Sequence, residues 1–177
     1  GNKYRGHISL YTGDRISTRK ETFFNIDDLD PLNNVVGEFT LGGPIPFSDN
    51  MLSFFLSGRI DENKGYLYGV REQNPWDYVY INPSNPNDIV VHSTGDGKVV
   101  AMNPSSRFSG TGKLTFRPSS TIKINYDFLY SYSKSQSYNH DYKYNPDGRV
   151  TGRDNGILNV LELRQALDAT TFYSLKG

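Results

Sequence analysis

Two clusters of aromatic side chains, each beside a polar group, are the residues of this sequence best suited to bind a ligand. The candidates are Trp76, Asp77, Tyr78 and Tyr80 in the segment NPWDYVYINP, and Tyr138, His140 and Tyr142 further along the chain. Aromatic rings stack on sugars, chelates or hydrophobic ligands, while a carboxylate or an imidazole can hydrogen-bond a polar rim. The clusters therefore predict ligand contact in two loops. The alternative is that these rings only pack on neighbouring loops.

Catalytic and metal-binding patterns are weak throughout the sequence. There is no cysteine, which excludes disulfides, thiol catalysis and thiolate metal sites. The three histidines lie in separate segments without the spacing of a zinc helix, and the acidic residues around Asp28 lack the spacing of an EF-hand calcium loop. The segment STGDGK lacks parts of a phosphate-binding loop, and no G-x-S-x-G motif occurs. We expect no enzyme, no metal site and no cofactor.

Composition and charge narrow the class of protein. The chain has 19 basic and 19 acidic residues, so its charge is balanced and does not suggest a nucleic-acid surface; we expect no nucleic-acid partner. No run approaches the roughly 18 apolar residues of a transmembrane helix, and no signal peptide opens the chain. With 13 tyrosines, 10 phenylalanines and 17 glycines, the composition favours β structure. The chain begins without Met and ends inside a predicted strand, so we expect a piece of a larger protein.

The segments that must position these clusters have the pattern of β-strands. Every second side chain from Ile122 to Tyr132 is apolar or aromatic, and most side chains between them are polar. Successive side chains of a strand point to opposite faces, so the pattern predicts one apolar face and one polar face. Seven strands are predicted, at about residues 3–13, 34–42, 51–61, 105–117, 121–135, 155–167 and 170–177. The segment NVLELRQAL in the sixth could also form a helix.

The connections between the predicted strands alternate between long and short. The long ones cover residues 14–33, 62–104 and 136–154. In an up-and-down sheet, alternate connections emerge at opposite ends, so the long loops gather at one end, as the external loops of outer-membrane barrels do. We therefore predict an all-β fold, an antiparallel up-and-down meander of about seven strands that forms a partial segment of a large transmembrane β-barrel. A soluble β-sandwich has the same alternation and stays open as an alternative.

Several segments also resemble a known family. They are GEFTLGGPIPFSDNMLSFFLSGRIDENKGYLYG at residues 37–69, KYRGHISLYTGD at 3–14, KLTFRPSSTIKINYDFLYSYSKSQSYNHDYKYNPDG at 113–148, and DATTFYSLKG at the end. The first resembles the early barrel hairpin of TonB-dependent outer-membrane receptors, and the others are similar to the first strand after the plug, a later hairpin with its loop, and the turn into a further strand. The elements are short, so they indicate the superfamily and carry no information on the cargo.

The resemblance implies a barrel of about 22 strands closed by a plug domain. This chain lacks the plug, the segment that engages TonB and most of the barrel, so it corresponds to the first part of the barrel domain. The implied function is energy-coupled uptake of a scarce nutrient, such as a siderophore, vitamin, glycan or peptide, across the cell outer membrane of a Gram-negative bacterium. The implied partners are outer-membrane lipid, the plug and remaining strands, TonB through the absent segment, and the nutrient ligand.

The polar face of the predicted strands would then line the barrel lumen. Its charged residues are Glu38, Arg59, Lys113, Arg117, Lys123 and Asp127. Hydrated lumen lining against the plug is the simpler role for these side chains, and specific ligand contact is the other. The alternative function for the whole chain is a soluble β-sandwich that binds carbohydrate or another ligand through Trp76 and the neighbouring tyrosines.

Overall fold

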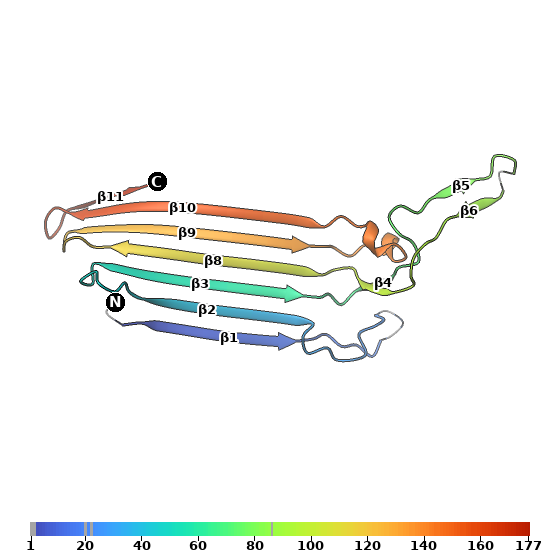
Figure 1. Cartoon of the computed structure of the whole chain (residues 1–177), viewed down its shortest axis with the longest axis horizontal. Helices are drawn as coiled ribbons and strands as arrows, with labels where there is room; N and C mark the ends of the chain where they lie inside the picture. Colours follow the sequence, from blue (N-terminus) through green and yellow to red (C-terminus); the bar gives the residue numbers. More distant parts are fainter. Residues whose placement is uncertain (1–2, 20, 22, 86) are drawn as a thin grey trace.

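The chain folds into one long antiparallel sheet with irregular loops at one end (Figure 1). The structure, a computed structural model, describes residues 3–19, 21, 23–85 and 87–177. The sheet strands are β1 (Arg5–Gly13), β2 (Asn34–Pro44), β3 (Leu52–Asn63), β8 (Ser105–Phe116), β9 (Ile122–Ser135), β10 (Gly152–Ala166) and β11 (Phe172–Lys176). They lie side by side in chain order, and each pairs antiparallel with the next. The predicted all-β, up-and-down meander of seven strands is confirmed.

The sixth predicted strand is a strand and not a helix. β10 pairs with β9 along nearly its whole length, from Gly152 opposite Ser135 to Gln165 opposite Ile122. This pairing decides the ambiguity of NVLELRQAL, because a helix would leave the edge of β9 without its hydrogen-bonding partner. β10 also begins earlier than the predicted residue 155, so the preceding loop is shorter than predicted.

The connection at residues 62–104 is more ordered than a plain loop. It contains four short strands, β4 (Tyr68–Val70), β5 (Val79–Ile81), β6 (Ile89–Val91) and β7 (Val99–Ala101). β4 pairs with β7, and β5 pairs with β6 in a hairpin that projects away from the sheet (Figure 1). The connection after β9 holds two short 3-10 turns, η1 (His140–Tyr142) and η2 (Pro146–Gly148).

Long and short connections lie at opposite ends of the sheet, as the alternation predicts. Figure 1 shows the three long connections beyond one end of the strands, and the three turns together with both chain termini at the other. In the turn between β2 and β3, the backbone N–H of Met51 bonds the carbonyl of Ser48 at 2.8 Å. Asp49 and Asn50 adopt left-handed backbone angles there, which short polar side chains tolerate.

The strand register gives the sheet two chemically distinct faces. Directly paired residues of neighbouring strands place their side chains on the same face. One cross-strand row reads Phe54, Leu114, Tyr126, Leu161, and the row on the opposite face reads Ser9, Glu38, Arg59, Ser109, Ser131. We call these surfaces the apolar face and the polar face. The separation has exceptions: Asn159 lies on the apolar face, where it accepts a hydrogen bond from the Tyr126 hydroxyl at 2.7 Å, and Leu129 lies on the polar face.

The described residues form no second layer over either face of the sheet. Among the residues that the structure describes, the buried apolar side chains are Ile26, Met102 and Pro146, and all three belong to the loop end. Side chains of the apolar face stay open, for example Ile8 at 83% exposure and Ile157 at 62%. No helix in the described part of the chain is long and apolar enough to cross a membrane. The apolar face therefore lacks the cover that an apolar surface of this extent requires in water.

Candidate functional site

Asp77, in the first predicted cluster, is fully engaged by its own loop. Its Oδ2 atom accepts hydrogen bonds from the backbone N–H groups of Asn74 and Thr94, each at 2.8 Å. Its Oδ1 atom accepts a bond from the Thr94 hydroxyl at 2.6 Å and lies 3.4 Å from Nδ1 of His92. The side chain is 3% exposed. The carboxylate therefore closes the loop, and this geometry leaves it no open oxygen for a ligand.

The electrostatics of Asp77 follow from these contacts. Burial of the carboxyl group disfavours its charge, but the hydrogen bonds from Thr94, from the two backbone N–H groups and from His92 outweigh this effect. Together they lower the pKa of Asp77 from its ordinary value of 3.8 to about 2. The residue is therefore a charged structural anchor at neutral pH.

The aromatic members of the first cluster remain accessible. Trp76 is 72% exposed, Tyr78 56% and Tyr80 47%. The Tyr78 ring stacks on the His92 ring, with centroids 4.9 Å apart and planes 7° from parallel, and lies 6.3 Å from the Tyr80 ring. Tyr78, Tyr80 and His92 thus form a short aromatic ladder on the β5–β6 hairpin, next to the anchor that Asp77 provides. Ligand contact by these rings stays a prediction.

The second predicted cluster lies in a separate place. The Tyr138 hydroxyl and His140 Nδ1 are 2.9 Å apart, and both residues line a hollow of about 120 Å³ together with Glu21, Phe23, Phe24 and residues 66–68. Tyr142 is not among the described residues that line this hollow, and the Arg149 guanidinium lies 5.3 Å from the centre of its ring. None of the residues of the Trp76 segment lines this hollow. The structure therefore does not join the two clusters into one site.

A brace between two long connections fixes their relative position. Arg71 lies in the connection between β3 and β8. It forms one ion pair with Asp147, in the connection between β9 and β10, and a second at 3.1 Å with Asp96, in its own connection. The hydrogen bond to Asp147 is the main cause that raises the pKa of Arg71, and the bond from Lys98 is the main cause that lowers the pKa of Asp96 to about 2. Backbone bonds from Glu72 and Gln73 to the carbonyl of Tyr144 run beside these pairs. Sequence reasoning missed this brace, since its members are far apart in the chain.

The charged residues predicted for the polar face are largely paired across neighbouring strands. Arg59 binds Glu38 and lies 3.7 Å from Asp61, and Lys113 Nζ lies 3.0 Å from Asp127. Each main pair consists of directly opposite residues in the register. Lys123 lies opposite Arg164 of β10 on the same face, and Arg117 follows the end of β8.

A buried polar network crosses three strands on the same face. Thr115 donates its hydroxyl hydrogen to Asn125 Oδ1 at 2.9 Å, and Asn125 Nδ2 donates to Glu162 at 2.9 Å. Asn125 is 2% exposed and Thr115 8%. These residues were not predicted as a network, although the alternation placed Thr115 and Asn125 on the polar face.

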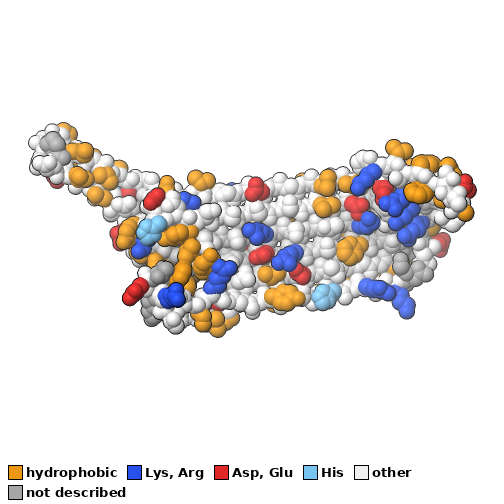
Figure 2. All heavy atoms as spheres, turned by 180° about the vertical axis from the view of Figure 1, so that it is seen from behind, with side chains coloured by type: hydrophobic (Ala, Val, Ile, Leu, Met, Phe, Trp, Pro, Cys, Tyr) orange, Lys and Arg blue, Asp and Glu red, His pale blue; other side chains and the backbone are white. Residues whose placement is uncertain are grey.

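The polar face is hollowed where small side chains meet charged ones. Figure 2 looks onto a face of the sheet whose middle carries Lys, Arg, Asp and Glu side chains among small uncoloured ones. One hollow, of about 540 Å³, is bordered by Arg59, Asp61, Arg107 and Asp154, with Ser109, Ser131 and Ser133 between them. The sequence alternation could have placed Arg107 and Asp154 here, but only the register of β8, β9 and β10 brings them together.

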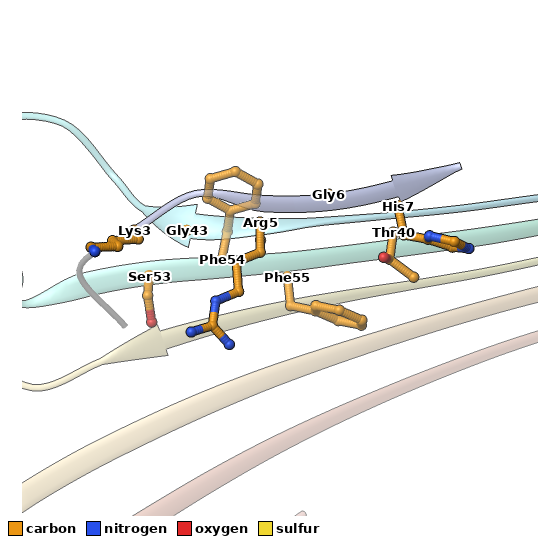
Figure 3. Close-up of a pocket in the computed structure, with 10 residues that line it drawn as sticks. Lys3, Arg5, Gly6, His7, Thr40, Gly43, Ser53, Phe54 and Phe55 are labelled. Atoms are coloured by element: carbon orange, nitrogen blue, oxygen red, sulfur yellow. The ribbon is translucent and has the colours of Figure 1, made fainter. Parts of the chain in front are cut away.

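A larger hollow lies at the turn end of the sheet, over β1, β2 and β3 (Figure 3). Its volume is about 770 Å³. Figure 3 shows Arg5, His7, Thr40, Ser53 and Phe55 on one side of the sheet, whereas the Phe54 ring points to the other side. Sequence reasoning assigned no site here.

A metal centre is not formed by the described residues, because no group of three or more His, Cys, Asp or Glu side chains comes close enough to hold an ion.

Comparison of the chain with models of protein families, with curated proteins and with solved structures finds no match. The functional argument therefore depends on the geometry of the sheet and its loops.

Proposed function

We propose that this chain forms part of the barrel wall of a TonB-dependent outer-membrane receptor, which takes up a scarce nutrient across the cell outer membrane of a Gram-negative bacterium. The observation that carries the proposal is the uncovered apolar face opposite a charged and hollowed polar face. In a barrel wall, lipid covers the first surface and the hydrated lumen the second.

The dimensions of the apolar face fit a bilayer. On β9 it runs from Ile122 to Tyr132, ten residue steps of about 3.4 Å each, or about 34 Å along the strand. At the usual strand tilt of about 40° this corresponds to a height of about 26 Å, close to the roughly 25 Å of apolar surface that outer-membrane barrels present. Tyr130 and Tyr132 lie at the loop end of this stretch, where amphipathic rings favour the interface.

At the loop end of the sheet, the apolar face gives way to charged side chains, as a membrane boundary would require. Beyond Tyr132 on the same face, the next cross-strand row contains Glu62, Ser106, Lys134 and Arg153. Charged side chains are costly in the hydrocarbon layer and ordinary outside it. The change from aromatic to charged rows supports an upper boundary between Tyr132 and Lys134.

The open edges of the sheet support a larger assembly. Within the described residues, no strand lies beside the outer edge of β1, and β11 pairs only with the part of β10 from Glu162 to Ala166. Backbone groups of such edges need partners in a membrane, where water cannot supply them. Further strands of a closed barrel would provide these partners.

The loop end supports a role in recognition. Arg71 and its ion pairs hold two long connections together, and the accessible rings of Trp76, Tyr78 and Tyr80 lie on a hairpin that projects beyond them. Rigidly supported aromatic side chains are suited to contact a ligand before it enters the barrel. The proposal assigns first contact with the nutrient to this hairpin.

Two adjacent residues test which face meets lipid. Phe128 lies on the apolar face and Leu129 on the polar face, and their exposures are 38% and 39%. Near the middle of a bilayer, Phe128→Arg should destabilise the membrane-inserted protein by about 2–4 kcal/mol. Leu129→Arg, the matched control, should insert almost normally because its side chain reaches the hydrated lumen. Insertion is measured by adding the chain to liposomes and is read from the protection of its strands against protease.

Two results would contradict the proposal in whole or in part. If the unmodified chain stays in aqueous buffer as a monomer with a cooperative unfolding transition and does not enter liposomes, the barrel proposal fails and the soluble β-sandwich is favoured. If the chain inserts but nutrient uptake through the complete receptor that contains it does not depend on TonB, the barrel wall stands and the assignment to TonB-dependent receptors fails.

A further inference from the structure

The hollow at the turn end of the sheet has a strongly basic lining. Lys3, Arg5 and His7 line it, and none of its lining residues in the described part of the chain is acidic. Arg5 and His7 alternate along β1, so the strand geometry directs both toward the polar face, and Lys3, which precedes the strand, lines the same hollow. Among the residues that the structure describes, no ion pair involves any of the three. The hollow therefore gathers positive charge that the sheet itself does not neutralise.

The nearest acidic groups on this face are already engaged. Glu38 lies diagonally from His7 in the register and is bound by Arg59. Asp127 lies on the row of Arg5, beyond Gly42, Phe55 and Lys113, and is bound by Lys113. Charges that are paired in this way compensate one another more than they compensate a third group. The cations of the hollow stay available to an external anion.

Gly42 leaves the base of the hollow open, because it has no side chain there. Gly42 lies directly between Arg5 and Phe55 in the register. A Cβ atom at Gly42 would come within 3.3 Å of the Phe55 ring and 3.2 Å of the carbonyl oxygen of Phe54. The bare backbone thus lets a ligand approach between the guanidinium and the ring.

The remaining lining supplies an apolar wall and neutral hydrogen-bond donors. Phe55 is 41% exposed, and Figure 3 shows its ring on the same side of the sheet as Arg5. The hydroxyls of Thr40 and Ser53 flank it. Guanidinium and ammonium groups form their strongest hydrogen bonds with carboxylates and phosphates, and an exposed ring favours a flat apolar group.

We propose that this hollow is a binding site for a small organic anion, with its carboxylate or phosphate held by Arg5, Lys3 and His7 and a flat apolar part packed on Phe55 over Gly42. The site lies on the polar face and does not depend on what covers the apolar face. It goes beyond the proposed function, because it adds an anion site at the turn end, opposite the aromatic hairpin.

The test titrates the purified full chain, in neutral detergent, with benzoate, its neutral isostere benzamide and the smaller anion acetate. The readout is the NMR signal of the His7 imidazole, identified by its loss in His7→Gln. We expect benzoate to shift this signal in a saturable way, acetate to require higher concentrations, and benzamide to have no effect. Equal responses to benzoate and benzamide, or no response to either, would overturn the proposal.

Variants locate the site. Arg5→Gln removes an exposed charge and should weaken benzoate binding by about tenfold or more, because bonds to charged groups are the strong ones. Lys123→Gln, on the same face but away from the hollow, is the matched control and should bind as the original chain does. Gly42→Ala should also weaken binding by filling the floor. Far-UV circular dichroism confirms the fold of each variant, and unchanged binding by folded Arg5→Gln would overturn the assignment.

Discussion

Asp77 and Thr94 are joined twice, by the backbone N–H and the hydroxyl of Thr94, at 2.8 and 2.6 Å from the two oxygens of one carboxylate. The pair connects the two ends of the segment that carries the β5–β6 hairpin. Since the same carboxylate also accepts a bond from the N–H of Asn74, one side chain organises the base of the projecting element. Trp76 is the next residue in the chain before Asp77, which places a fluorescent reporter beside this anchor.

The first prediction concerns this anchor. Asp77→Asn keeps the size of the side chain but replaces one acceptor oxygen with a donor group, so two of its bonds must be lost or rearranged. We expect the hairpin to loosen, with several-fold faster proteolysis between residues 74 and 94 and a change in the fluorescence of Trp76, the only tryptophan. Asp88→Asn, at the far end of the hairpin, is the control and should leave both readouts near their original values.

The second prediction is a pH dependence with a definite sign. The folded-state pKa of Asp77 is lowered to about 2 from 3.8, and that of Asp96 is lowered likewise. A lowered pKa means that folding favours the charged form, so the stabilisation is complete above pH 4 and is lost as the pH falls toward 2. Trp76 fluorescence should report loosening of the hairpin in that window. In Asp77→Asn the part of the transition due to Asp77 should disappear; an identical transition in this variant would contradict the assignment.

The third prediction concerns the brace between the long connections. Arg71→Met retains much of the apolar length of the side chain but removes the ion pairs with Asp96 and Asp147. We expect several-fold faster protease cleavage of both connections, measured by mass spectrometry of the fragments. Lys98→Met is the matched control, because Lys98 is 74% exposed at its side chain and pairs only with Asp96 in the described structure. Equal effects of the two substitutions would show that Arg71 does not brace the loops.

The fourth prediction concerns a ring laid over a glycine on the apolar face. Phe39 lies directly opposite Gly58, and a Cβ atom at Gly58 would come within 2.2 Å of the Phe39 ring. Gly58→Ala should therefore force the ring aside and destabilise the folded sheet by about 1–3 kcal/mol. Gly37→Ala is the control on the same face, since its Cβ would meet only Leu10 at 3.9 Å. Urea unfolding in lipid or detergent measures both; a Gly58→Ala variant as stable as Gly37→Ala would refute the packing argument.

The sequence by itself determined the strands and their two faces, because apolar and polar residues that alternate with a period of two separate onto opposite faces only in an extended chain. Ile122 to Tyr132 fixed the apolar side of β9, and the lengths of the connections fixed which ends of the strands carry the loops. The segment NVLELRQAL, residues 159–167, was ambiguous, because a short apolar run suits a helix or a strand until a neighbour supplies its hydrogen bonds. Pairing of β10 with β9 decided that it is a strand.

Only the tertiary structure decided which of the candidate residues act together. Asp77 looked like a ligand contact beside three rings, but its oxygens are occupied by residues up to 17 positions away, a distance over which local pattern has no influence. The ion pairs of Arg71 and the hollow over Gly42 likewise need the register of separate segments. Local periodicity specifies the direction of a side chain; contacts between distant segments specify what that side chain meets.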